Sequence, residues 1–284
     1  MDPQQHTYAE LRASGMTRRG IDRAVRAGDL IRVRKGRYLE SHAASDVVRA
    51  ARLGGKPDCI SLLADLGVFV LERPALHIVV PVGSSRLGTV PKGVVRHWRS
   101  LDDDVVANPV VVGALAQACR CQPIPAAIAT LDSAWHLGLV EEAEIADVLS
   151  LLPARYRAIR PFLDPLAESG PETLVRLMLR RLGSSCVAQV EIHRVDLLVD
   201  GWLIVECDSK AFHSSWKQQR DDRRRDFAAA QAGYVTLRLL AEDIMYRPDE
   251  VMSALRGALS GRPTVHNSSR KSGSAASGAS RHFL

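Results

Sequence analysis

The segment VDLLVDGWLIVECD, residues 195–208, decides the fold of the C-terminal part of this chain. Two apolar runs flank Asp200-Gly201, which predicts an antiparallel hairpin. A two-residue turn would set Asp196 opposite a valine and bury its carboxylate. A connection of odd length centred on Gly201 sets Asp196 opposite Glu206 and leaves one face of the hairpin apolar, and register follows the buried face. We therefore predict that Asp196, Glu206 and Asp208 lie on one side of the sheet.

Further helices and strands are predicted on both sides of this hairpin. Pro171 is a good first helical residue and Gly233 a helix stop, and the spacing of apolar residues separates helices from strands. The predicted order is helix, three-stranded meander, helix, strand and helix, over Pro171–Arg181, Cys186–Ile192, Arg194–Val199, Leu203–Asp208, Lys217–Ala232, Tyr234–Leu239 and Ala241–Leu259, the last interrupted at Arg247-Pro248.

Carboxylates gathered on a sheet repel one another unless something offsets their charge. Mg²⁺, or Mn²⁺ in its place, is the natural candidate, since Mg²⁺ takes oxygen ligands from one or two carboxylates plus waters. A metal so held can supply a hydroxide and stabilise the charge of a pentavalent phosphate. The bland alternative is that Asp196 or Asp208 caps a strand end or pairs with an arginine. An Asp followed ten residues later by Glu-x-Asp across a tight turn favours a nuclease-like metal site.

A set of short pieces in residues 166–260 carries a family resemblance. The pieces are Glu172, Arg194–Asp196, Val205–Asp208, Phe212–Ser215, Arg220–Asp226, Ala232–Tyr234 and Leu237–Arg238. In order and spacing they resemble the restriction-endonuclease-like PD-(D/E)XK superfamily, and within it the very-short-patch-repair (Vsr) endonucleases. The resemblance implies that Asp196 and Glu206 are the metal ligands and that Glu172 is an accessory acid. Ser209 departs from the glycine that relatives carry after Glu-x-Asp.

The same resemblance assigns roles to residues that follow the hairpin. Asp208 stands where the wider superfamily carries its lysine, as it does in relatives of this subgroup, and Lys210 is a candidate substitute two residues further on. His213 is a candidate base or water-positioning residue. Asp222 and Arg225, three apart on one helix face, would hold the site or bind phosphate.

Basic residues are concentrated near the N-terminus. The chain carries 38 Lys+Arg against 32 Asp+Glu, a formal net charge of +6. Residues 16–37 hold an excess of basic over acidic residues equal to that whole net charge, which suggests a polyanion-binding module attached to an otherwise neutral protein. The basic residues are Arg18, Arg19, Arg23, Arg26, Arg32, Arg34, Lys35 and Arg37.

The pattern around these cations predicts two helices and two strands. A short helix over Tyr8–Ala13 precedes a basic helix over Arg18–Ala27, and Leu30–Tyr38 alternates around a turn at Lys35-Gly36. This is a helix–turn–helix followed by a basic wing, in which the second helix fits the major groove and wing arginines reach phosphates. The alternative is an ordinary solvated basic helix, but cations on both helix and wing favour DNA binding.

The string GMTRRGIDRAVRAGDLIRVRKGRYL, residues 15–39, resembles the N-terminal winged-helix domain of the AbiEi antitoxin family. Residues 41–150 fit the remainder of such proteins more loosely, including Leu131–Ala134. Helices are predicted near 45–53, 59–71, 112–120, 124–137 and 141–151, and strands over Leu76–Val82 and Val94–Trp98.

Histidines and cysteines in the chain are predicted to be structural. His77, His97 and His136 are isolated in the sequence, and lone histidines are more often structural than chemical. Cys119 and Cys121 are too close for the usual zinc spacing. We therefore expect the five cysteines to be reduced and mostly buried.

Together these patterns predict a mixed α/β chain of four parts. They are a winged helix-turn-helix domain (1–40), an α/β middle domain (41–165), a nuclease-like α-βββ-α-β-α domain (166–260) and a flexible Ser/Gly-rich tail (261–284). No run of about 18 apolar residues exists, which predicts no transmembrane helix. The polar start lacks a secretory signal, so a cytoplasmic protein is expected.

The expected function is metal-dependent hydrolysis of a DNA phosphodiester, in phage defence, toxin–antitoxin biology or DNA repair. The rival is an antitoxin-type transcriptional regulator whose nuclease-like domain is inactive. A pure protein-interaction module, the third reading, would show no salt-dependent DNA affinity. Candidate partners are DNA, a second copy of the chain and a cognate toxin or defence protein, with no membrane.

Overall fold

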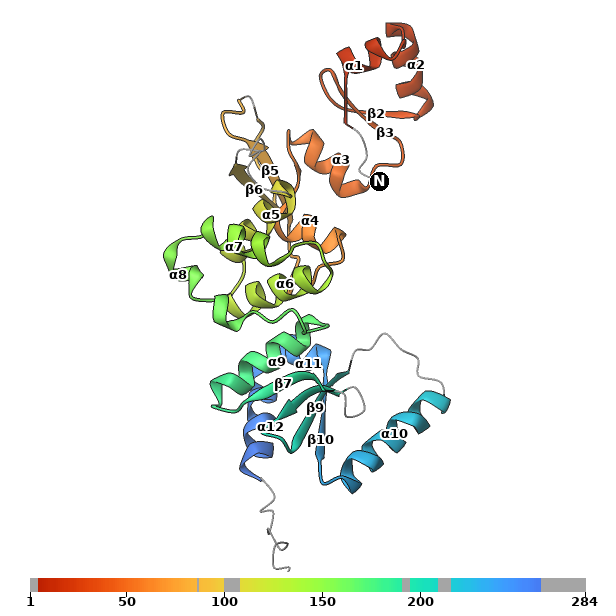
Figure 1. Ribbon diagram of the computed structural model, residues 1–284. Helices are drawn as coiled ribbons and strands as arrows, with labels where there is room; N and C mark the ends of the chain where they lie inside the picture. Colours follow the sequence, from red (N-terminus) through yellow and green to blue (C-terminus); the bar gives the residue numbers. More distant parts are fainter. Residues whose placement is uncertain (1–4, 86, 100–107, 191–194, 209–215, 262–284) are drawn as a thin grey trace, which may run out of the picture.

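The computed structural model describes residues 5–85, 87–99, 108–190, 195–208 and 216–261. Over these residues the fold is mixed α/β, with twelve α-helices and three small sheets, so the predicted class is confirmed. Figure 1 shows the N-terminal elements at one end of the molecule, a helical middle and the C-terminal sheet at the other end. Lys210 and His213 lie outside the described residues, as does the side chain of Asp222.

The N-terminal elements are two helices beside a three-stranded sheet. They are β1 (His6–Thr7), α1 (Tyr8–Ala13), α2 (Arg18–Ala27), β2 (Leu30–Arg34) and β3 (Arg37–Glu40), and the strand order is β1-β3-β2. Both helix boundaries predicted for α2 are confirmed. The Thr17 hydroxyl accepts from the Gly20 N–H at 3.0 Å, and Gly28 ends the helix with a φ of 84°.

The middle elements surround a helical core and carry one small sheet. They are α3 (Ser45–Arg52), β4 (Lys56–Pro57), α4 (Cys59–Asp65), β5 (Leu76–Pro81), β6 (Val94–Arg99), α5 (Pro109–Cys121), α6 (Ile124–His136), α7 (Glu142–Ser150), α8 (Ala154–Arg157) and the 3-10 helix η1 (Arg160–Phe162). The sheet order is β4-β5-β6, with β5 and β6 parallel. The prediction that α4 reaches residue 71 is wrong, because Gly67 follows it with a φ of 82°.

The C-terminal elements form a four-stranded sheet between helices. They are α9 (Gly170–Arg181), β7 (Cys186–Val190), β8 (Val195–Val199), β9 (Leu203–Asp208), α10 (Trp216–Gln231), β10 (Val235–Leu240), α11 (Ala241–Tyr246) and α12 (Pro248–Ser260). The strand order is β10-β9-β8-β7, and only the β9–β10 pair is parallel. The core between this sheet and helices α9, α11 and α12 includes Leu179, Leu197, Val205, Ile244 and Leu255. The element order and the interruption before Pro248 agree with the sequence prediction.

The register of the β8–β9 hairpin is the predicted one. Leu197 pairs with Val205 and Val199 with Leu203, so three residues connect the strands. Asp200, the first of them, has a φ of 47° that its short polar side chain tolerates. One detail differs from the alternation: Val195 packs against Ile204 and Ala229 on the α10 side, although Leu197 and Val199 face α9.

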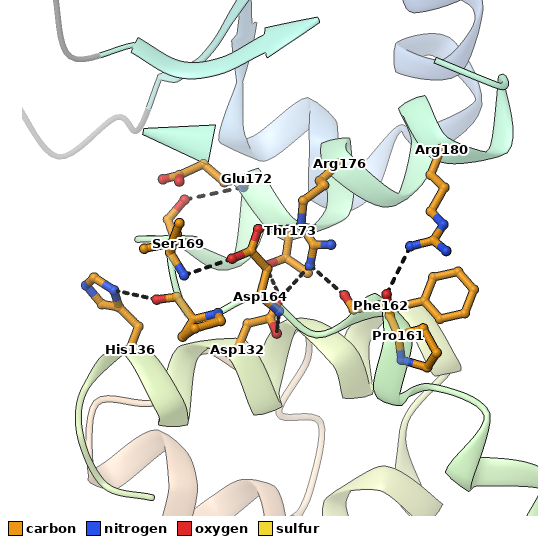
Figure 2. Close-up of polar contacts among 12 residues, drawn as sticks. Asp132, His136, Pro161, Phe162, Asp164, Ser169, Glu172, Thr173, Arg176 and Arg180 are labelled. Atoms are coloured by element: carbon orange, nitrogen blue, oxygen red, sulfur yellow. Dashed lines mark hydrogen bonds and ion pairs between the residues drawn. The ribbon is translucent and has the colours of Figure 1, made fainter. Parts of the chain in front are cut away.

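Helices α6 and α9 join the middle elements to the C-terminal sheet through a buried polar network (Figure 2). Asp132 on α6 is 1% exposed, and its carboxylate accepts from the Thr173 hydroxyl at 2.9 Å, from Arg176 at 2.7 Å and from the Asp164 N–H at 2.8 Å. At the start of α9, a Cβ on Gly170 would lie 2.2 Å from the Phe69 ring, so only glycine permits this approach. The predicted boundary near residue 165 therefore falls within a tightly packed interface.

Candidate functional site

The acidic residues singled out in the sequence lie around the C-terminal end of β9. Glu206 and Asp208 are on β9 itself, Asp196 is on the neighbouring β8, and Glu172 is in the first turn of α9. Asp196 and Glu206 are half-buried, while Glu172 is 5% exposed. The fold thus brings together residues from three elements of the predicted site.

The Asp196 side chain accepts a backbone hydrogen bond from β9 near the end of the β8–β9 pairing. Its Oδ2 accepts from the Cys207 N–H at 2.7 Å, and among the described residues no hydrogen bond to Oδ1 is found. Burial raises the pKa of Asp196, and the neighbouring charges of Asp208 and Glu168 raise it further against the lowering effect of the Cys207 N–H. The carboxylate is therefore held by a hydrogen bond to one oxygen, and its ionised form is disfavoured by burial and by neighbouring negative charges.

Glu206 is a strongly perturbed acid of this group. Burial raises its pKa to about 7, and the nearby carboxylate of Asp196 adds to the shift. Arg238 and Arg225 act in the opposite direction. No hydrogen bond or ion pair from another described residue closes on the Glu206 carboxylate.

Arg238 on β10 holds Asp208 and a residue of α10. Its guanidinium pairs with the Asp208 carboxylate at 3.2 Å and with Asp226 at 2.7 Å. The Asp226 hydrogen bond and charge raise the pKa of Arg238, which stays cationic. Arg238, Asp226 and Arg225 line a small hollow beside Glu206. Asp208 is thus paired with an arginine, as the bland alternative for this residue proposed.

Glu172 is held at the N-terminus of α9. Ser169 caps the helix by accepting from the Glu172 N–H at 3.3 Å (Figure 2). A Glu172 carboxylate oxygen accepts from the Glu168 N–H at 3.1 Å. Its charge is felt at Cys207, which places it beside the end of β9. Glu172 is therefore built into the site wall and shares in the negative potential there.

The acidic residues do not form a compact set of three ligands in the described part of the chain. Within the described ranges, no acidic residue of this group belongs to a set of three potential ligands whose atoms lie mutually within 4.8 Å. Asp208 stays close enough for its charge to act on Asp196 and Glu206, while its carboxylate pairs with Arg238. Two half-buried carboxylates with raised pKa values still fit Mg²⁺, which binds one or two carboxylates and keeps several waters.

The basic residues of α2 and the following hairpin form an exposed surface. Seven of the eight predicted DNA-binding residues are exposed, and no ion pair to them is found in the described part of the chain: Arg18, Arg19, Arg23, Arg26, Arg32, Lys35 and Arg37. Arg34 is the exception, since it is half-buried and its Nη1 atom lies where a Cβ on Gly54 would stand. Arg34 therefore reaches the middle elements instead of the open surface.

A group that the sequence reading treated as separate residues is assembled in the middle elements. The side chains of Cys59, His77, His97 and Cys121 offer ligand atoms that all lie within 4.8 Å of one another. The expectation that His77 and His97 are isolated is wrong, because their ring nitrogens are 3.0 Å apart. The four residues are dispersed along the sequence, so no local spacing signals this group.

Comparison with known proteins adds no family. No protein-family model matches the chain, and a search of the curated proteins returns no match. In the described residues no helix is long and apolar enough to cross a membrane.

Proposed function

We propose that this protein binds DNA through its N-terminal helices and hairpin and hydrolyses a phosphodiester at the acidic site of the C-terminal sheet. The observation that carries the proposal is the pair Asp196 and Glu206, half-buried and raised in pKa at the end of a helix–meander–helix–strand unit. Glu206 lines a hollow together with Arg225 and Arg238, and perturbed acids in such surroundings are typical of functional sites.

The N-terminal part supplies affinity in this proposal. Exposed arginines on α2 and on the β2–β3 hairpin lie on a helix–turn–helix followed by two strands, the arrangement of a winged helix. Because these cations have no carboxylate partner in the described chain, they are available to phosphates. Binding of this kind is largely non-specific and weakens steeply with salt.

The C-terminal part supplies the chemistry. Asp196 and Glu206 would hold a Mg²⁺ or Mn²⁺ ion, which when bound lowers the pKa of a bound water and offsets charge on the phosphate. Arg225 and Arg238 lie beside Glu206 and contribute positive potential where a phosphate would approach. Asp196, fixed by the Cys207 N–H, presents one oxygen in a defined direction. These are the roles that the Vsr-like resemblance implies for Asp196 and Glu206.

Nicking of supercoiled plasmid with Mg²⁺ or Mn²⁺ tests the hydrolytic part. Asp196→Asn and Glu206→Gln should each lower the nicking rate by at least about 100-fold, the usual scale for loss of a group that acts on the reacting proton or metal. Asp249→Asn and Glu250→Gln are matched controls, since both residues are exposed at the start of α12. Nicking that survives in the site variants would contradict the proposal.

A second function is favoured by the Arg238–Asp208 pair. Because Asp208 is tied to Arg238 and no described lysine replaces it, the C-terminal sheet could serve binding alone in an antitoxin-type transcriptional regulator. Under this alternative the wild-type protein leaves plasmid intact with either metal, while it represses its own promoter and loses repression on Arg19→Gln with Arg23→Gln.

A further inference from the structure

We propose that Cys59, His77, His97 and Cys121 bind one Zn²⁺ ion in a closed structural site, separate from the acidic site. The four residues come from four elements: the start of α4, β5, β6 and the last residue of α5. Their separations along the chain match no local zinc motif, and only folding brings them together.

The geometry of the four side chains fits a tetrahedral ion. His77 Nδ1 lies 3.0 Å from His97 Nε2, and Cys121 Sγ lies 3.9 Å from the same His97 atom. Ligand bonds of about 2.0 Å to nitrogen and about 2.3 Å to sulfur at tetrahedral angles separate the ligand atoms by roughly 3.3–3.8 Å. All four atoms already lie within 4.8 Å of one another, so an ion needs only small movements.

The chemistry of the donors selects the metal. Two thiolates and two imidazoles are soft and intermediate ligands that suit Zn²⁺, whereas Mg²⁺ and Mn²⁺ prefer carboxylates and water. A full set of four protein ligands leaves no open position, which is typical of structural rather than catalytic zinc. The site is therefore expected to hold zinc alongside a different divalent ion at Asp196 and Glu206.

The surroundings of the cluster support its ligands. Gln117 donates to Cys121 Sγ at 3.4 Å from one turn earlier on α5, and the Ser61 hydroxyl accepts from the backbone N–H of His77 at 2.9 Å. Asp58, directly before Cys59, is 1% exposed, and its Oδ2 has no hydrogen-bond partner in the described chain although Oδ1 pairs with Arg99 at 2.5 Å. The charge of His97 acts on Asp58, and a carboxylate near a ligating histidine is a common outer contact of zinc sites.

The backbone at Cys59 carries strain that a ligand would explain. Its φ is 54°, a conformation unfavourable for a residue with a Cβ, and it stands at the first position of a helix. Strained residues of this kind persist where the surrounding structure holds them, often at ligand sites. Here the conformation goes with a fully buried side chain in the cluster.

The position of the cluster suggests what the ion would do. The β4-β5-β6 sheet has only a small apolar core, formed by Ala50, Leu76, Ile78 and Val94. A zinc ion held by β5 and β6 on one side and by α4 and α5 on the other would fasten this sheet to the main helical core. Metal binding of this kind contributes directly to folding, because the ligands are dispersed in the unfolded chain.

Metal analysis of the full-length protein, purified without chelators, tests the proposal. We expect about one zinc per chain, a loss of at least about tenfold in bound zinc for Cys121→Ser and for His97→Gln, and no change for the matched controls Cys186→Ser and His136→Gln. Wild-type protein that holds no zinc after exposure to excess zinc and gel filtration would overturn the proposal. Zinc retained in full by both site variants would overturn it as well.

A spectroscopic measurement on the wild type guards against variants that fail to fold. Co²⁺ added to metal-free protein should give the visible bands of a tetrahedral ion with thiolate ligands, and zinc should abolish them. Mass spectrometry should find the Cys59 and Cys121 thiols protected from alkylation until a chelator is added. A Cys59–Cys121 disulfide in place of metal, or a cobalt spectrum without thiolate bands, would contradict the proposal.

Discussion

Asp132 and Glu206 are both buried enough to have raised pKa values, about 6 and about 7, yet their surroundings differ completely. Asp132 accepts three hydrogen bonds from groups of α9 and the segment before it. Glu206 accepts none from the described residues and is faced by another carboxylate. A buried polar group that is fully satisfied fixes packing, whereas one left open is a place for a ligand.

The same contrast applies to arginines. Arg176 is 9% exposed, and its guanidinium donates hydrogen bonds to Asp132 and, at 2.8 Å, to the Phe162 carbonyl (Figure 2). Arg19 and Arg23 on α2 are exposed and meet no carboxylate in the described chain. An arginine with its donors used inside the fold is structural, and one with its donors in water is available to phosphate.

Replacing Asp132 gives the largest expected effect. Asp132→Ala leaves the Arg176 charge buried without its partner, so we expect the free energy of unfolding to fall by about 3–5 kcal/mol. Urea unfolding measures it. Glu206→Ala should cost little or nothing, because it removes a carboxylate that burial already destabilises. A comparable loss in both variants would break the contrast between the two acids.

Replacing exposed arginines is expected to change DNA affinity, an effect of intermediate size among these predictions. Replacing Arg19 and Arg23 together with glutamine should lower the slope of log affinity against log salt by about 2, since each phosphate contact contributes roughly 0.9. Fluorescence anisotropy with duplex DNA over a salt series measures it. Arg155→Gln with Arg181→Gln removes the same charge elsewhere and should leave the slope unchanged; an equal drop would mean that net charge alone binds DNA.

The pH dependence of the free energy of unfolding is the smallest expected effect, and its direction is well defined. The pKa of Glu206 rises from 4.5 in the unfolded chain to about 7 in the fold, so the folded state binds more protons between these values. Stability contributed by the protonated group is present below pH 4.5 and is lost as the pH rises to about 7.

Unfolding measurements across this pH range distinguish the contribution of Glu206 from that of Asp132, because Asp132 has a pKa of about 6 and its contribution is lost as the pH rises to about 6. Glu206→Gln should remove the decline between about pH 6 and 7, and saturating Mg²⁺ should reduce it, because a cation favours the ionised carboxylate. A wild-type protein whose stability rises over that interval would contradict the assignment.

Local signals in the sequence predicted most of the secondary structure. Thr17, Gly28, Gly233 and Pro248 begin or end helices through their own backbone preferences, and such preferences act within a few residues. The register of the 195–208 hairpin followed from the same kind of reasoning, because only one pairing keeps an apolar face. The side chain of Val195 in β8 departs from simple alternation, since it packs against Ala229 of α10.

What the sequence determined by itself is where helices and strands lie and which carboxylates of the hairpin become neighbours. Only the tertiary structure decided that Asp208 turns to Arg238, that Arg34 leaves the basic surface, and that Asp132 locks α6 to α9. It alone also brought Cys59 to Cys121 and His77 to His97. These partners lie tens of residues apart, and contacts across such distances depend on how whole elements pack, which no local pattern of residues encodes.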